Sequence, residues 1–214
     1  MNINLQHIDP ISPSVLEAPP PGDRLNVQND VYMNEHITVR APQYPGMAIG
    51  HRLTVRWVTG RYKFDTATQT VTETGAFDFL IPRWLFVDSI GSLATINYSI
   101  RLPNQPLIPS RTLTLQVDAQ QFNLTEPRLS ADQKRVTVKF LGQTTGYTVK
   151  VRWHGVVVRN TETKPILDSA SIPFDIPDSW LKENAGKTVR INYSVYLSGS
   201  GKKLMFSQVL TVNL

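Results

Sequence analysis

The feature that most constrains this chain is an internal repeat. The tripeptide Val55–Trp57 returns as Val151–Trp153, 96 residues later, and three more blocks follow in the same order at nearly the same spacing. The matching blocks are Phe77–Pro82 with Ile172–Pro177, Ile96–Ile100 with Ile191–Val195, and Ser110–Val117 with Ser207–Leu214. Four ordered blocks at one spacing indicate a duplication, so we expect one fold to occur twice in the chain.

Within these blocks apolar residues alternate with polar ones. Leu53, Val55 and Trp57 are apolar, the residues between them are polar, and Ile96–Ile100 and Leu210–Leu214 follow the same pattern. A period of two places one set of side chains on a core and the other in solvent, as in a half-buried β-strand. Fifteen prolines and twelve glycines supply turns between short strands. The pattern and the length of 214 residues predict two all-β domains.

Each repeat also carries one segment typical of a short helix, Pro82–Gly91 in the first and Pro177–Gly186 in the second. Proline at the first helical position and glycine just past the last are the usual ends of a single helical turn. We expect this turn to cross from one sheet to the other, with Trp84 or Trp180 closing the end of the sandwich. A platform on which a sugar ring stacks is the alternative role for these tryptophans.

A tryptophan on an early strand followed about forty residues later by a tyrosine on a late strand resembles immunoglobulin-like (Ig-like) and fibronectin type III sandwiches. Here Trp57 is matched with Tyr98, and Trp153 with Tyr193. The chain contains no cysteine, which points away from antibody-type domains and toward cysteine-free bacterial relatives. The string Tyr44–Trp57 and the later blocks look like the ~100-residue Ig-like repeats of large repetitive bacterial surface or secreted proteins.

This resemblance implies two tandem Ig-like β-sandwich domains with an adhesin-like or interaction role. It divides the chain into an extended segment over residues 1–13, a first repeat over 14–118 and a second over 119–214. The second repeat lacks the Tyr-Pro-Gly-Met portion of the first, so its match depends on the later blocks. Almost no spacer separates the repeats, which predicts limited bending between them.

The net charge of +5 does not by itself indicate a nucleic-acid partner. Lysines and arginines alternate with apolar residues along the predicted strands, as in Val149–Trp153, which is typical of the solvated face of a sheet. No basic cluster with interleaved aromatic residues occurs. The absence of cysteine excludes disulfides and thiolate chemistry. We therefore expect no nucleic-acid partner and a core held by apolar packing.

Motifs for catalysis are missing from the sequence. None of the four histidines, His7, His36, His51 and His154, has a second histidine at a metal-binding spacing. Serine-nucleophile elbows, phosphate-binding glycine loops and zinc-protease motifs are absent. A carboxylate pair that hydrolyses glycosidic bonds stays open, although the acidic residues show no sign of convergence. These residues are Asp65, Glu73, Asp78, Glu162, Asp168 and Asp175. We expect no enzyme, cofactor or metal, and a structural role for Asp78 and Asp175, which occupy equivalent positions.

The two repeats differ most in the hairpin after the matched tyrosine. In the first repeat Arg101–Pro109 is rich in proline, whereas in the second Tyr196–Phe206 is rich in glycine, serine and lysine. Loops on a rigid scaffold are where sandwiches acquire distinct binding surfaces. We therefore take Lys202, Lys203 and Met205 as the tentative ligand loop, with a plain solvated loop as the alternative.

The sequence thus favours a non-catalytic interaction module that binds a protein or acts as a spacer. One alternative is a carbohydrate-binding module, for which an aromatic such as Tyr44, Tyr62 or Tyr147 should lie open beside polar side chains. Another is an accessory subunit of a secreted toxin or injection machine. Self-association through exposed edge strands is a further option. The amino terminus lacks a signal peptide and no stretch has ~20 apolar residues, which favours surface display or secretion without a cleaved signal and leaves the cytoplasm open.

Overall fold

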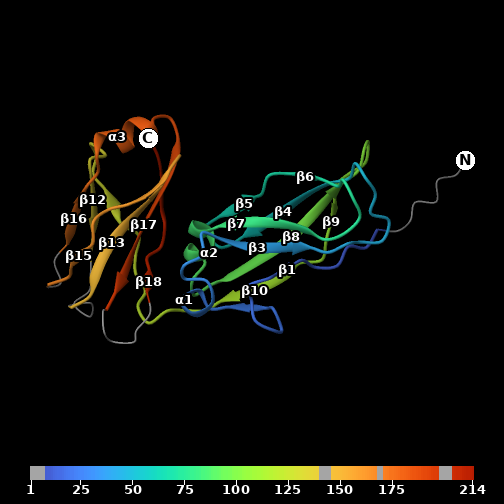
Figure 1. The fold of residues 1–214 in the computed structure, drawn as a ribbon, viewed down its shortest axis with the longest axis horizontal. Helices are drawn as coiled ribbons and strands as arrows, with labels where there is room; N and C mark the ends of the chain where they lie inside the picture. The colour runs from blue at the N-terminus through green and yellow to red at the C-terminus, as the bar shows by residue number, and fades with distance from the viewer. Residues whose placement is uncertain (1–7, 140–145, 168–170, 198–203) are drawn as a thin grey trace, which may run out of the picture. The chain divides into compact units, whose positions relative to one another are not determined.

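The structure is a computed structural model that describes residues 8–139, 146–167, 171–197 and 204–214. The chain folds as two compact units, unit 1 over Met1–Ala119 and unit 2 over Gln120–Leu214. Nearly all regular structure in both units is β-strand, with three short helices (Figure 1). The all-β fold class predicted from the period of two is therefore confirmed.

Unit 1 consists of two sheets. A three-stranded sheet has the order β1-β3-β7, and a larger one has the order β2-β10-β8-β4-β5, with β6 paired to β4 and β9 paired to β8. All pairs are antiparallel except the parallel pair of β2 and β10. The strands are β1 (Ser14–Val15), β2 (Arg24–Leu25), β3 (His36–Ala41), β4 (Arg52–Val58), β5 (Lys63–Asp65), β6 (Gln69–Thr70), β7 (Phe77–Pro82), β8 (Leu93–Arg101), β9 (Ile108–Pro109) and β10 (Leu113–Val117).

Unit 2 repeats this arrangement. A three-stranded sheet has the order β11-β12-β16, and the other sheet has the order β14-β13-β17-β18, with β15 paired to β13 and β19 paired to β17. The strands are β11 (Arg128–Leu129), β12 (Arg135–Val138), β13 (Thr148–His154), β14 (Val158–Asn160), β15 (Lys164–Pro165), β16 (Ile172–Asp175), β17 (Thr188–Tyr196), β18 (Met205–Phe206) and β19 (Leu210–Asn213). The central pair β13–β17 thus corresponds to the pair β4–β8 of unit 1.

The inward face of the central pair forms the core of each unit. Trp57 and Tyr98 are fully buried in unit 1, as are Trp153 and Tyr193 in unit 2. Each tyrosine lies directly opposite the valine two residues before its tryptophan, so the two large rings sit diagonally across neighbouring strands. Burying an aromatic side chain of this size removes 150–250 Å² from water. The matched residues of the sequence are therefore core residues.

The predicted helical turns occur in both units. They are α2 (Arg83–Asp88) and α3 (Asp178–Glu183), and in each the preceding proline, Pro82 or Pro177, takes the N-cap position, one residue before the predicted place. Trp84 is buried against the edges of two neighbouring rings. The third helix, α1 (Val27–Asp30), has no counterpart in the sequence predictions.

The duplication is also visible as repeated hydrogen bonds. The Ser110 hydroxyl accepts from the Tyr98 backbone N–H at 3.0 Å and donates to the Arg111 carbonyl at 2.8 Å. In unit 2 the Ser207 hydroxyl accepts from the Tyr193 N–H at 2.9 Å and donates to the next carbonyl at 2.8 Å. The same sequence block therefore builds the same local contact in both units.

The described part of the N-terminal segment contacts unit 1. Pro10 and Pro13 are buried, and the Pro10 carbonyl accepts from the Arg111 backbone N–H at 3.0 Å. The Asp9 carboxylate pairs with the Arg111 guanidinium at 2.6 Å. Residues 8–13 contain no helix or strand.

Candidate functional site

Only one residue of the predicted ligand loop lies among the described residues. Lys202 and Lys203 fall outside them. Met205 lies in β18, opposite Val195 of β17, and only 1% of its surface is exposed because it packs into the core of unit 2. The Met205 side chain is therefore part of the core and is not available to a ligand. A ligand-binding role for Lys202 and Lys203 stays a prediction.

The aromatic side chains named for sugar binding do not form open platforms. Tyr44 and Tyr147 are buried. Tyr62 is half-buried, with its ring 5.4 Å from that of Trp84 in an edge-on arrangement. Trp84 itself is buried, which also removes it as a stacking platform. These rings pack inside the units or against one another.

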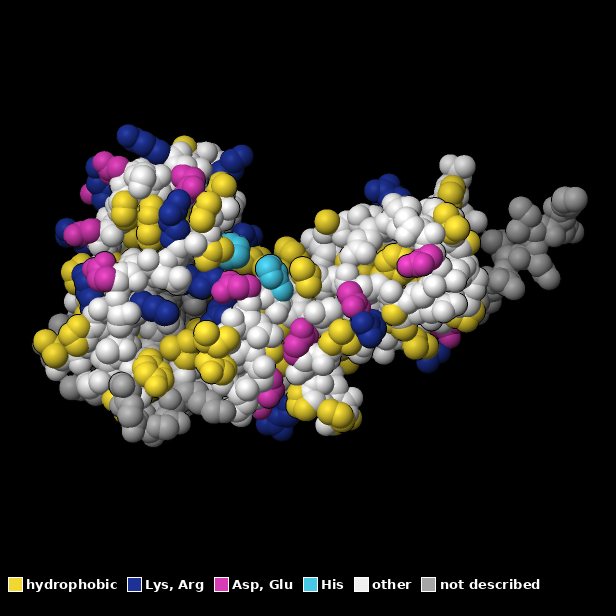
Figure 2. All heavy atoms as spheres, viewed as in Figure 1, with side chains coloured by type: hydrophobic (Ala, Val, Ile, Leu, Met, Phe, Trp, Pro, Cys, Tyr) yellow, Lys and Arg dark blue, Asp and Glu magenta, His cyan; other side chains and the backbone are white. Residues whose placement is uncertain are grey.

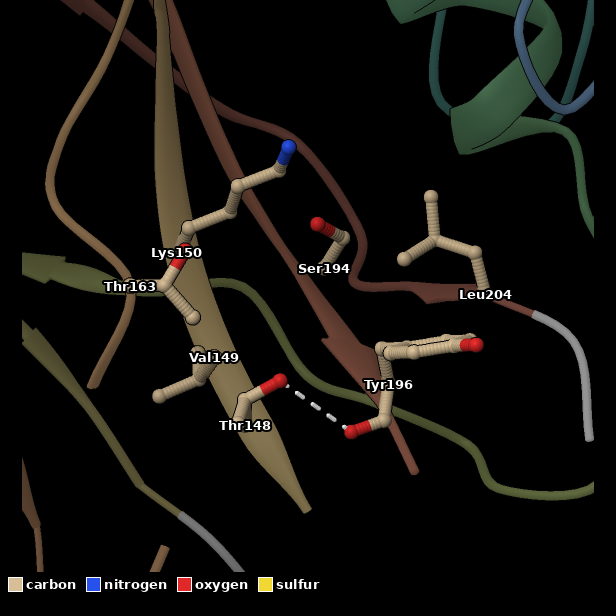
Figure 3. A pocket seen from close by; sticks show the side chains of 7 residues that line it. All are labelled: Thr148, Val149, Lys150, Thr163, Ser194, Tyr196 and Leu204. Atoms are coloured by element: carbon tan, nitrogen blue, oxygen red, sulfur yellow. Dashed lines mark hydrogen bonds between the residues drawn. The ribbon is translucent and has the colours of Figure 1, made fainter. Parts of the chain in front are cut away.

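Unit 2 has a small pocket on the outward face of the pair β13–β17, which we call the unit 2 hollow. Its volume is about 210 Å³. It is lined by Thr148, Val149, Lys150, Thr163, Ser194, Tyr196 and Leu204 (Figure 3). Pockets that enclose drug-sized ligands measure ~300–1,000 Å³. The unit 2 hollow can therefore receive a single ring or side chain, with the rest of a ligand outside it.

Strand register places polar side chains of the unit 2 hollow on the same outward face as one aromatic residue, Tyr196. Thr148 lies opposite Tyr196, and Lys150 lies opposite Ser194. Side chains two residues apart share a face, so Ser194 and Tyr196 stand side by side with Leu204 beside the ring (Figure 3). The Thr148 hydroxyl donates to the Tyr196 carbonyl at 3.2 Å. Tyr196 is among the exposed large hydrophobic residues, with 43% of the residue's surface exposed.

Unit 1 has a second pocket, the unit 1 hollow, of about 510 Å³. It is lined by Gly50, Arg52, Arg101, Leu102, Pro103, Asn104 and Gln105. Arg52 of β4 lies directly opposite Arg101 of β8, and both are exposed. Thr148 and Tyr196 follow these arginines by 96 and 95 residues and form the corresponding cross-strand pair. The two hollows therefore share one equivalent cross-strand pair, which carries different side chains in the two units, while the rest of their linings differs.

Of the carboxylates considered for catalysis, Asp65, Asp78 and Asp175 are held in ion pairs on strand surfaces, and Asp168 lies outside the described residues. Asp65 accepts two hydrogen bonds from Arg56, and Asp78 accepts two from Arg40. These guanidinium hydrogen bonds lower the pKa of both carboxyl groups. A general acid for glycoside hydrolysis needs a raised pKa, so neither group suits that role. Asp175 pairs with Arg135 at 3.0 Å, at the place equivalent to Asp78.

Among the four histidines, His7 lies outside the described residues, and His51 contacts a buried tyrosine. Its Nδ1 lies 2.8 Å from the hydroxyl of the buried Tyr44, and the two rings are stacked. Burial lowers the pKa of His51 and raises the pKa of Tyr44 to about 12. Both groups are therefore neutral near pH 7. Among the described residues, histidine and acidic side chains form no group of three that could hold a metal ion.

Positive and negative side chains are mixed on the surface. Lys and Arg alternate with Asp and Glu on the face shown in Figure 2. Several cations pair with carboxylates, such as Lys134 with Asp178 and Arg159 with Glu183. The face in Figure 2 thus offers no continuous basic surface of the kind that follows a nucleic-acid backbone. Within the described ranges, every helix is too short or too polar to cross a membrane.

Comparisons with known proteins give structural matches alone. No family model matches the chain, and no curated protein matches it. Three solved structures cover 94–96% of this chain. They are the BSP domain of a biofilm-associated protein (18% identity, TM-score 0.29), a 1.5-MDa bacterial ice-binding adhesin described for host cell surface retention (11%, 0.32), and a tetra-tandem repeat in the extending region of a large adhesion protein (12%, 0.38).

This chain spans 29%, 64% and 49% of the length of those three chains. With TM-scores below 0.5, these matches show no function for this chain.

Proposed function

We propose that this chain is a non-catalytic interaction module of adhesin-like type, in which a duplicated Ig-like sandwich presents a ligand surface on each unit. The observation that supports this most is that a hollow lies at the same cross-strand pair in each unit and that this pair differs between the units. A cross-strand pair of arginines lines one, and a threonine opposite an exposed tyrosine lines the other. Equivalent scaffolds with different surface side chains are how sandwich domains acquire different ligands.

The chemistry of the described carboxylates supports a role without catalysis. Asp65 and Asp78 are ionised and held by arginines on different sheets of unit 1. A hydrolase of the two-carboxylate type needs its acid and base on either side of one bond. Turnover of any glycoside or peptide in a broad panel of chromogenic substrates would contradict the proposal. We expect none above the buffer rate.

A carbohydrate ligand is the second candidate, and the exposure of Tyr196 favours it. Tyr196, which is 43% exposed as a residue, lines the same pocket as Lys150, Ser194 and Thr163. Sugars present an apolar face that stacks on aromatic rings and hydroxyl groups that need hydrogen-bond partners. The unit 2 hollow offers both kinds of contact within one pocket.

The experiment that separates these functions is a glycan array probed with the labelled chain at physiological salt. For a carbohydrate ligand we expect a saturable signal that is lost in Tyr196→Ala. Tyr32→Ala is the matched control, because Tyr32 has nearly the same exposure, 42%, and lies in unit 1. A signal that both variants lose equally, or neither loses, places the sugar elsewhere. A blank array rejects the carbohydrate candidate and leaves protein binding or spacing.

A further inference from the structure

The unit 1 hollow contains two positively charged side chains at directly opposed strand positions. Arg52 and Arg101 face each other directly across β4 and β8. Like charges at directly opposed positions destabilise a sheet. Neither guanidinium has a carboxylate within ion-pair distance among the described residues. The pair therefore brings two positive charges into one pocket without a compensating carboxylate from the described part of the chain.

Other arginines on the strands of unit 1 are compensated. Arg56, four residues from Arg52 on β4, lies opposite Asp65 and donates to it at 2.7 and 2.9 Å. Arg40 lies opposite Asp78 and donates to it at 2.7 Å through two nitrogen atoms. The exception at Arg52 and Arg101 coincides with the pocket, whereas the compensated arginines lie outside its lining.

The surroundings of the two arginines add neutral hydrogen-bonding groups. The hairpin that follows β8 contributes Asn104 and Gln105 to the lining. Asn104 has a positive φ of 57°, a left-handed conformation that asparagine adopts more readily than most residues. Together the lining offers two guanidinium forks and two amide groups within about 510 Å³. Arginine forks match the geometry of carboxylate and sulfate oxygens through paired N–H donors.

We propose that the unit 1 hollow binds one carboxylate or sulfate group of an acidic sugar, held between Arg52 and Arg101. The bound anion supplies the negative charge that an aspartate opposite the arginine supplies at Arg40 and Arg56. The surrounding amides hydrogen-bond to the sugar hydroxyls. A nucleic acid fits less well, because a basic surface for it would have to contact several successive phosphates. This inference concerns a different site from the Tyr196 ring and does not depend on it.

The test is a titration of the full chain, at physiological salt, with four probes followed by amide chemical shifts. The probes are a heparin-derived sulfated tetrasaccharide, trigalacturonic acid, neutral maltotriose and a single-stranded DNA decamer. We expect the sulfated or the carboxylate sugar to bind and to shift amides around Arg52 and Arg101, and maltotriose to leave them unchanged. The stronger of the two acidic probes identifies the anionic group. Binding of the DNA alone, or of no probe, overturns the proposal.

Variants connect the binding to this pair of arginines. Arg52→Thr and Arg101→Thr are each expected to weaken binding about ten-fold or more, because a charge-assisted contact is lost. The double replacement of both arginines by lysine keeps the charge but not the fork, so we expect intermediate binding. Arg56→Thr is the matched control on the same strand and should change the affinity less than about two-fold, since Arg56 is engaged by Asp65.

Two results would overturn the assignment. In the first, Arg56→Thr weakens binding as much as Arg101→Thr, which indicates general charge attraction. In the second, the threonine variants keep the wild-type affinity. If a threonine variant does not fold, as judged by its amide spectrum, the lysine double variant decides: wild-type affinity in that variant also rejects the paired-fork geometry.

Discussion

Ser110 and Ser207 test whether a contact that occurs in both units contributes equally to the free energy of unfolding of each. Each hydroxyl sits in the same contact, between the backbone N–H of a core tyrosine and the carbonyl of the following residue. Replacement of either serine by alanine removes one acceptor and one donor at a buried place. The N–H of Tyr98 or Tyr193 then loses the side-chain acceptor that it has in the folded chain.

The expected loss follows from the cost of leaving a buried donor unsatisfied. That cost is about 1–3 kcal/mol for a neutral group. The donor–acceptor distances in the two units agree closely, at 3.0 and 2.9 Å for the accepted bond and 2.8 Å for both donated bonds. We therefore expect Ser110→Ala and Ser207→Ala to lower the free energy of unfolding by about 1–3 kcal/mol each, and by similar amounts.

The assay is urea denaturation combined with hydrogen exchange read by peptide mass. Ser110→Ala should reduce amide protection within Met1–Ala119, and Ser207→Ala within Gln120–Leu214. Ser14→Ala makes the same chemical change at an exposed strand position and should stay within about 0.5 kcal/mol of the parent. This control separates the loss of the hydrogen bonds from the general effect of replacing serine in a strand.

Two outcomes would refute the reasoning. If Ser110→Ala costs no more than Ser14→Ala, the repeated serine contact contributes no net stability. If one serine variant reduces protection equally over both halves of the chain, the two units unfold together and are not independent in stability.

Three further predictions concern single residues. Gly155→Ala should destabilise unit 2 by about 1–3 kcal/mol, because an added Cβ collides with the Asn184 side chain, while Gly60→Ala, with open space, should be neutral in the same denaturation assay. Trp57→Ala should cost about 3–5 kcal/mol and expose unit 1 amides to exchange while those of unit 2 stay protected. Burial lowers the pKa of His51 below 6.5, so the unfolded chain binds its proton first and stability falls as pH drops below about 6.5. Denaturation at pH 7.5 and 5.5 should show this loss, and His51→Gln should reduce it.

Much of the fold could be predicted because core side chains carry a strict period. The alternation of Leu53, Val55 and Trp57 identifies the inward face of β4 without any knowledge of its neighbours. The proline and glycine that flank each helical turn are equally local signals. The short helix α1 was missed although Asn26 caps it, with its side chain accepting from the Asn29 N–H, because a four-residue helix has too short an apolar pattern to recognise.

The binding surfaces could be predicted less well, because they depend on which residues lie opposite each other. Met205 was assigned to a ligand loop from its neighbours in sequence, but its pairing with β17 turns it into the core. Tyr196 was overlooked because nothing local distinguishes an exposed tyrosine at a strand end from a buried one. Arg52 and Arg101 lie opposite each other only because of how two strands about fifty residues apart in sequence are paired, and the sequence alone does not give this register.

The register also explains why the two repeats can differ at the hollows and agree elsewhere. Residues that face inward, such as Trp57 and Trp153, contact the packed core, where a change of volume costs several kcal/mol. Outward residues such as Arg52 and Thr148 lie on the sheet surface, each between two neighbouring strands and outside the packed core, so their replacement leaves the core intact. Exchange of the outward pair should therefore transfer anion binding while the fold persists. The double variant with Thr148→Arg and Tyr196→Arg is expected to fold with the parent's amide protection. It should also gain affinity for the acidic sugar probe. Failure to gain that affinity in a folded variant would mean that the hairpin after β8, and not the arginine pair alone, builds the unit 1 hollow.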